Sequence, residues 1–222
     1  KETLHQYLAG FGFGVKTRLG CPGETTGVLT GHRRWSDIDA GAISFGQGIS
    51  VSAVQLISGV SAIANNGILM KPMLIKKIIS NKGKEIQAFS PVRIRNAVSS
   101  GTAARVKAMM GRVVQEKGTG TKAAISGYPV CGKTGTAQKA DKEKKGYAKE
   151  KYISVFAGFA PKNNPKLATL VVVDEPRKGH YGGDVAAPAF REIMTQAFNC
   201  LNIPPENRPE MVAALAVPGE NQ

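Results

Sequence analysis

Apolar residues recur at helical spacing in two long stretches of the chain. Within residues 50–67 they stand at positions 54, 57, 60, 63 and 64, three to four residues apart. A serine at either position 50 or position 52 can cap this segment, and Asn65-Asn66-Gly67 supplies a stop. A second run after residue 100 places Val106, Met110 and Val113 on one face. Both patterns predict amphipathic helices, and shorter helices are expected at residues 3–9 and 187–201.

The remaining apolar segments favour strands. Residues 152–160 alternate between apolar and polar or small positions, and residues 167–173 form a nearly continuous apolar run. Together with residues 129–138 they predict a three-stranded antiparallel meander. A hairpin is expected from residues 69–80 and 84–89 around Gly83. Residues 15–48 show no long periodic segment, and residues 139–151, with six lysines, are expected to form a polar loop.

The pattern as a whole predicts an α+β fold, with an antiparallel sheet covered by helices. Residues 1–202 are expected to belong to one domain. The segment 203–222 contains four prolines and is expected to be a disordered tail.

The composition of the chain gives it a large positive net charge. The 222 residues include 30 lysines and arginines against 16 acidic residues, a net charge of +14. This excess favours an anionic partner, which can be nucleic acid, an anionic membrane surface or an acidic polymer. A basic nucleic-acid-binding domain is therefore one alternative, although no helix-turn-helix, RRM or KH pattern accompanies the charge. The three cysteines are far apart, and neither a metal site nor a cofactor is expected.

One segment matches the P-loop pattern letter for letter. Residues 127–134 read Gly-Tyr-Pro-Val-Cys-Gly-Lys-Thr. A P-loop needs a buried strand before its first glycine and a helix that begins at its lysine. Here the preceding residues are only weakly apolar, and Thr-Gly-Thr follows Lys133. The flanks therefore predict a strand that runs into Lys133, and they argue against a phosphate loop.

In an extended strand, Lys133 and Gly135 share one face, and Thr134 and Thr136 share the other. Gly135 leaves room for a substrate backbone along the strand. The lysine supplies positive potential, the two hydroxyls can bind a carboxylate, and a backbone N–H can hold a developing oxyanion. A Lys-Thr-Gly-Thr string alone fits equally well with an ordinary edge strand that carries a surface lysine.

The flanking segments distinguish these interpretations. Together they resemble class B penicillin-binding proteins, with the matches in the family's order over about residues 10–200, and the cell-division type is the most similar. The segments that carry the resemblance are 44–50, 118–124, 127–138, 156–161 (Phe-Ala-Gly-Phe-Ala-Pro), 171–176 and 181–188 (Tyr-Gly-Gly-Asp-Val-Ala-Ala-Pro).

The resemblance implies a penicillin-binding, serine β-lactamase-like fold and a D,D-transpeptidase that cross-links peptidoglycan stem peptides. In that family Lys133 would be the electrostatic and proton-network lysine. Thr134 and Thr136 would hold the substrate carboxylate, and the N–H of Thr136 would form half of the oxyanion hole. Tyr181, with Tyr152, would belong to an aromatic wall.

The implied partners are stem peptides ending in D-Ala-D-Ala, β-lactams that mimic them, and membrane proteins of the divisome. The implied location is the periplasmic face of the inner membrane, with the membrane anchor outside this chain.

Two motifs of the family are absent from these 222 residues. None of the twelve serines has a lysine three residues on, and none has an asparagine two residues on. The Ser-x-x-Lys nucleophile and the Ser-x-Asn motif are therefore expected in a missing N-terminal half of the domain. On this interpretation the chain is the C-terminal portion of a transpeptidase domain and is inactive alone. A non-catalytic scaffold module of the same fold and a hydrolytic serine enzyme stay open as alternatives.

Overall fold

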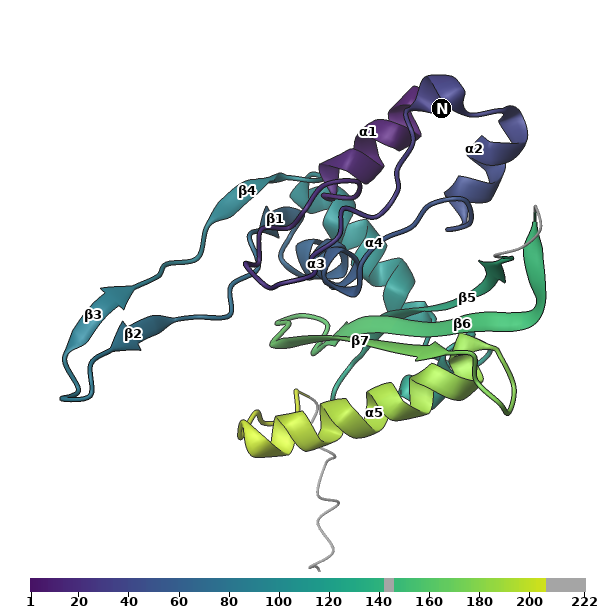
Figure 1. The fold of residues 1–222 in the computed structure, drawn as a ribbon. Helices are drawn as coiled ribbons and strands as arrows, with labels where there is room; N and C mark the ends of the chain where they lie inside the picture. The colour runs from purple at the N-terminus through teal and green to yellow at the C-terminus, as the bar shows by residue number, and fades with distance from the viewer. Residues whose placement is uncertain (142–145, 207–222) are drawn as a thin grey trace, which may run out of the picture.

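The computed structural model describes residues 1–141 and 146–206 of the chain. Its helices surround a central sheet, and a long two-stranded arm extends from one side (Figure 1). The α-helices are α1 (Glu2–Gly10), α2 (Asp37–Ser44), α3 (Ala53–Ala64), α4 (Ser100–Arg112) and α5 (Gly182–Cys200), with short 3-10 turns at His32–Arg34 and Thr121–Ala123. The strands are β1 (Ile68–Met70), β2 (Lys77–Ile79), β3 (Glu85–Ala88), β4 (Arg93–Asn96), β5 (Cys131–Ala140), β6 (Tyr147–Ala160) and β7 (Leu167–Asp174).

The central sheet is the predicted antiparallel meander, in the order β5-β6-β7. One face packs against α5, where the rings of Phe156 and Phe190 lie 4.7 Å apart between centroids. The other face packs against α3 and α4 through Cys131, Phe159 and Ile63. Helices thus cover both faces, and the predicted α+β class is confirmed.

Helix α3 forms where its apolar spacing predicted it, and its N-terminus explains its position. Ser52 and Gln55 form a capping box, in which the Ser52 hydroxyl accepts from the backbone N–H of Gln55 and the side-chain Oε1 of Gln55 accepts from the backbone N–H of Ser52. The buried Gln55 amide also donates to the carbonyls of Val15 (2.8 Å) and Thr26 (2.9 Å). This one side chain therefore holds the preceding loop against the helix.

Two segments contain more regular structure than the sequence pattern indicated. Within residues 15–48, helix α2 begins at a capping box between Ser36 and Asp39. Only one of its residues, Ile43, is buried, so the sequence shows no helical repeat of apolar residues from which the helix could be predicted. The lysine-rich loop is shorter than residues 139–151, because β5 extends to residue 140 and β6 begins at Tyr147.

Helix α5 begins five residues earlier than predicted, at Gly182 instead of residue 187. The sequence Gly-Gly-Asp opposes helix formation in isolation, and Pro188 suggests a first turn. The contact of Gly182 with the sheet, described below, overrides both preferences.

The predicted hairpin is confirmed in its outer part, where β2 pairs with β3 around Gly83. Its inner part differs, because β1 pairs with β4, a strand that the sequence did not indicate. The two ribbons follow one another along the arm (Figure 1).

The segment predicted to be a tail begins in contact with the body. The Tyr128 hydroxyl donates to the carbonyl of Ile203 (2.7 Å), and the N–H of Glu206 donates to the carbonyl of Gly127 (2.9 Å). Residues 207–222 lie outside the described part of the chain. Within that part, no helix has both the length and the apolar content needed to cross a bilayer.

Two glycines of β5 are expected to respond differently to a methyl group. At Gly132 it would overlap the buried Phe156 ring, whereas at Gly135 the only atom of the described residues within 4 Å is Val155 Cβ, at 3.5 Å. Because overpacking a core costs about 1–3 kcal/mol, Gly132→Ala should lower the free energy of unfolding by that amount in urea titrations. Gly135→Ala should change it by less than about 1 kcal/mol. Equal losses in both variants would contradict this distinction.

Candidate active site

The candidate site lies along β5, which is an edge strand in the described part of the chain. Its register with β6 runs without a shift from Cys131 to Gln138, so the strand neither bulges nor reverses its faces at Gly135. The predicted separation of Lys133 from the two threonines onto opposite faces is therefore present. Lys133 shares its face with Cys131, which packs beneath α4, and Thr134 shares its face with Gly132, which packs against the Phe156 ring.

The two threonine hydroxyls are positioned by different partners. Thr136 Oγ1 accepts from the backbone N–H of Gly182 (3.1 Å). Thr134 Oγ1 lies 3.0 Å from Thr119 Oγ1, where either hydroxyl can donate. A hydroxyl has one proton and two lone pairs. The Thr136 proton is therefore left available to an acceptor, as is one of the two protons of the Thr119–Thr134 pair.

A helix N-terminus lies against the same hydroxyls. Methyl groups on Gly182 and Gly183 would overlap the carbonyl oxygens of Gly135 and Thr119 respectively, so only glycines allow α5 to begin this close to β5. The positive end of the helix dipole thus adds to the potential at Thr136. Asp184 opposes it, but the carboxylate pairs with Lys122 Nζ at 2.8 Å.

Lys133 reaches around the free edge of the strand. Its Nζ donates to the Thr134 carbonyl (2.9 Å) and lies 3.5 Å from the Thr134 hydroxyl. The Thr134 carbonyl therefore faces the open edge. Because alternate residues of an antiparallel strand present their backbone groups to the same edge, the N–H and C=O of Thr136 face it too. Backbone donors, an ammonium group and two hydroxyls are thus grouped within four residues.

An aromatic row borders this region. Tyr152 stacks on His180, with centroids 4.3 Å apart, and His180 contacts the ring of Tyr181 at 4.4 Å. Tyr181 precedes the first residue of α5 and is 62% exposed. The two tyrosines singled out in the sequence are therefore brought together.

Sequence reasoning missed two residues that the structure places here. Thr119 lies in a segment that carried the resemblance but had no assigned role. His180, which was not singled out, completes the aromatic row. The signal for His180 was its position beside Tyr181, whereas the contact between Thr119 and Thr134 spans fifteen residues and depends on the fold.

Two side chains near the strand that could act as nucleophiles, those of Ser154 and Cys131, are buried. Ser154, which pairs with Thr136 in the register, is fully buried and donates its hydroxyl to the His180 carbonyl. Cys131 is also buried, and its thiol donates to the Lys107 carbonyl (3.3 Å). Burial raises the pKa of this thiol from 9.0 to about 11, although Lys162 and Lys107 act in the opposite direction. It is therefore a protonated, unreactive thiol at neutral pH.

The fold and the site together define an α+β domain with an open, basic and hydroxyl-bearing edge strand. The family model for the penicillin binding protein transpeptidase domain matches residues 1–195. The chain belongs to this family. The P-loop interpretation of residues 127–134 is excluded directly, because Lys133 lies inside β5 and no helix begins there.

Curated relatives agree with this assignment. Probable peptidoglycan D,D-transpeptidase PenA of Neisseria meningitidis is 37% identical over 218 residues, which is 98% of this chain and 35% of the relative. Peptidoglycan D,D-transpeptidase FtsI of Buchnera aphidicola is 36% identical over 201 residues, 88% of this chain and 33% of the relative. The chain thus spans about a third of the length of these relatives. The resemblance to class B penicillin-binding proteins is confirmed, and nucleic-acid binding finds no support.

Solved structures give the same result. Penicillin binding protein 3 of Mycobacterium tuberculosis superimposes with a TM-score of 0.82 at 32% identity, covering 92% of this chain and 47% of that one. The same protein has been solved in complexes with ampicillin and aztreonam. The transpeptidase domain of penicillin-binding protein 3 from Burkholderia pseudomallei gives a TM-score of 0.78 at 36% identity, covering 91% of this chain and 58% of that one.

The three cysteines are expected to differ in reactivity. Cys21 and Cys200 are exposed, whereas Cys131 is buried with a raised thiol pKa. Iodoacetamide at pH 8 should therefore modify Cys21 and Cys200 and leave Cys131 unmodified until the chain is unfolded with urea, as peptide mass spectrometry can show. Modification of Cys131 at the rate of the exposed cysteines, in folded protein, would contradict its assignment as an inert core thiol.

Proposed function

We propose that this chain provides the substrate-binding strand of a peptidoglycan D,D-transpeptidase that cross-links stem peptides through a serine acyl-enzyme. The observation that carries the proposal is the edge of β5 that no described strand covers, where the donor groups of Lys133, Thr134 and Thr136 lie beside the N-terminus of α5. An extended peptide can bind such an edge by strand addition. The named activity of the relatives supports the same conclusion.

The terminal carboxylate of a D-Ala-D-Ala peptide is the ligand group that we assign to the two threonines. Thr136 already accepts a hydrogen bond from Gly182, so its own proton can be donated to a carboxylate oxygen. The Thr119–Thr134 pair offers a second proton. Charge-assisted hydrogen bonds of this kind are stronger than neutral ones. Gly135 leaves the space in which the peptide backbone lies, and Tyr181 borders it.

Lys133 and the backbone of Thr136 have the roles closest to the chemistry. A serine that attacks the carbonyl of the penultimate D-Ala produces a tetrahedral intermediate with a negatively charged oxygen. The N–H of Thr136, at the open edge, supplies one of the two donors that hold this oxygen. The ammonium of Lys133 stabilises the same charge and takes part in proton transfer. The serine and its base lysine belong to a Ser-x-x-Lys motif, which these 222 residues do not contain.

The proposed chemistry implies where the protein acts and which molecules it binds. Cross-linking occurs at the cell wall, so we place the domain at the outer face of the cytoplasmic membrane. Stem peptides and β-lactams would bind the same edge of β5, and division proteins in the membrane would be neighbours. Ampicillin and aztreonam complexes are known for a similar structure, penicillin binding protein 3 of M. tuberculosis.

Removal of the Thr136 hydroxyl should weaken substrate binding. Acetyl-Lys-D-Ala-D-Ala is expected to bind the 222-residue chain in the millimolar range, measured by NMR titration. Thr136→Val should raise the dissociation constant roughly tenfold or more, because a hydrogen bond to a charged group is lost.

Thr136→Ser, which keeps the hydroxyl, should bind within about threefold of the native chain. The peptide with an amidated C-terminus should bind no better to the native chain than to Thr136→Val. Unchanged binding in Thr136→Val would refute the carboxylate assignment.

The chain alone should not form a covalent complex with a β-lactam. Incubation with a fluorescent penicillin should leave the intact mass of the protein unchanged and give no labelled band, because no activated serine is present. A stoichiometric adduct on the 222-residue chain would show that another residue acts as the nucleophile.

A further inference from the structure

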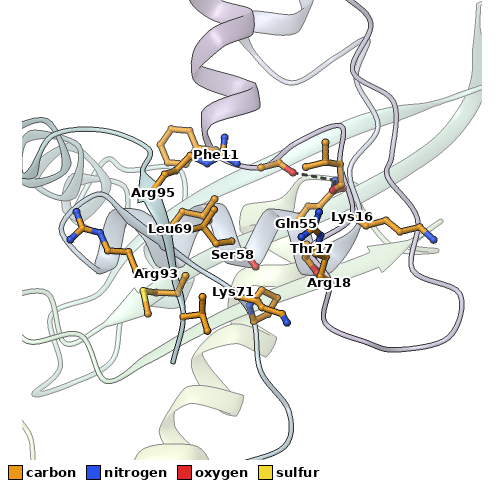
Figure 2. Close-up of a pocket in the computed structure, with 16 residues that line it drawn as sticks. Phe11, Lys16, Thr17, Arg18, Gln55, Ser58, Leu69, Lys71, Arg93 and Arg95 are labelled. Atoms are coloured by element: carbon orange, nitrogen blue, oxygen red, sulfur yellow. Dashed lines mark hydrogen bonds between the residues drawn. The ribbon is translucent and has the colours of Figure 1, made fainter. Parts of the chain in front are cut away.

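A cavity of about 410 Å³ lies at the root of the arm, away from β5. Its walls come from the loop after α1, from α3 and from the segments around β1 and β4 (Figure 2). Its volume falls within the range of small-molecule sites. None of the residues assigned to the transpeptidase site lines it, so that function does not account for it.

Cations surround this cavity. Figure 2 shows Arg93 and Arg95 on one side of Leu69 and Ser58, and Lys16 and Arg18 on the other. Lys71 lines the cavity as well. No Asp or Glu lines it, and none of the five cations forms an ion pair with a carboxylate of the described residues. Arginine binds phosphate oxygens in pairs, so the arrangement is suited to a phosphate group.

A second cavity of about 450 Å³ adjoins the first. The two share four wall residues, Ser58, Met70, Lys71 and Pro72. Lys71 is the only charged residue of the second cavity, and its apolar lining includes Ile57, Ile68 and Met73. Most of the positive charge thus lines the first cavity, and the second is mainly uncharged, with Lys71 at the boundary. A ligand that fills both needs an anionic head and an apolar tail.

The walls are held in place without a ligand. The buried Gln55 amide fixes the loop after α1 through the Val15 carbonyl. The Glu24 carboxylate accepts from the Thr17 N–H (2.6 Å) and from the Thr17 hydroxyl. These hydrogen bonds hold the loop in place beside Arg18. Across the cavity, the N–H of Lys71 donates to the Val92 carbonyl (2.9 Å) and closes the root of the arm. A preformed site loses little conformational entropy on binding.

We propose that these joined cavities form a binding site for a phosphate-bearing amphiphile, with the phosphate held by Lys71 where the two cavities meet, in the positive potential of Arg18 and Arg95, and the alkyl tail against Ile57, Ile68 and Met73. The same chemistry is offered by a free alkyl phosphate and by a phospholipid within a bilayer. The site is independent of the β5 edge and of the transpeptidase proposal.

Octyl phosphate, below its micelle-forming concentration, is the probe for isothermal titration of the 222-residue chain. It should bind at least about tenfold more tightly than ethyl phosphate, because each buried CH₂ contributes about fourfold. The double variant Lys71→Glu/Arg95→Glu should weaken octyl phosphate binding tenfold or more. Lys82→Glu/Lys84→Glu, at the tip of the arm, changes the net charge equally and should bind within twofold of the native chain. All four residues are exposed, so each variant should melt at the native temperature.

Co-sedimentation with phosphatidylcholine vesicles that contain phosphatidylglycerol identifies the source of the ligand. Vesicle binding that is lost only in Lys71→Glu/Arg95→Glu supports a bilayer headgroup. Binding of octyl phosphate without vesicle binding supports a free amphiphile. The proposal is overturned if neither probe binds, if the arm-tip variant loses as much affinity as the cavity variant, or if ethyl and octyl phosphate bind equally.

Discussion

The N-terminus of α5 lies directly on the backbone of β5 and β6, and the geometry of the candidate site depends on that contact. Gly182 sits above the paired residues Gly135 and Val155, where any side chain would overlap their carbonyl oxygens. Its N–H donates to the Thr136 hydroxyl, which fixes the direction of that group. The helix then runs along the face of the sheet and buries Phe190 and Met194. The same contact therefore anchors the core and orients the site.

Packing and binding make opposite demands on the glycines of β5. Gly132 has no side chain because the Phe156 ring occupies the space, so the described residues explain it fully. Gly135 has room for a methyl group, and no contact with the other described residues requires a glycine there. A glycine that the core does not need, on an open strand edge between Thr134 and Thr136, fits best with a ligand backbone that approaches there. This contrast supports our proposal that β5 binds a ligand, over the alternative of an ordinary edge strand.

Much of the fold could be predicted because its strongest signals are local. Strands β6 and β7 follow from apolar spacing, helix α3 from apolar spacing and its serine cap, and β5 from the segments on either side of Lys133. Helix α2 could not be predicted in this way, since it buries only Ile43 and is specified by its capping box. The start of α5 could not either, because Gly182 is a poor helix former and its place is set by contact with a distant strand.

The candidate site likewise has a part that follows from local sequence and a part that depends on long-range packing. Lys133, Thr134 and Thr136 are adjacent in sequence, so their shared strand and their two faces could be predicted from a period of two. The Thr119 hydroxyl and the N–H of Gly182 reach the same place from 15 and 46 residues away. Only the packing of α5 and the loop before η2 (Thr121–Ala123) brings them there. The strand could be predicted from the sequence, but the groups that orient its hydroxyls could not.

Hydrogen exchange at the edge of β5 tests the central claim most directly. In the 222-residue chain alone, the amide protons of Thr134 and Thr136 should exchange faster than those of Lys133 and Gly135, which face β6. Acetyl-Lys-D-Ala-D-Ala should slow exchange at Thr134 and Thr136, and the L-Ala-L-Ala peptide should not. If both peptides leave these two amides unchanged, or protect them equally, the edge of β5 is not the stereospecific substrate-binding strand described here.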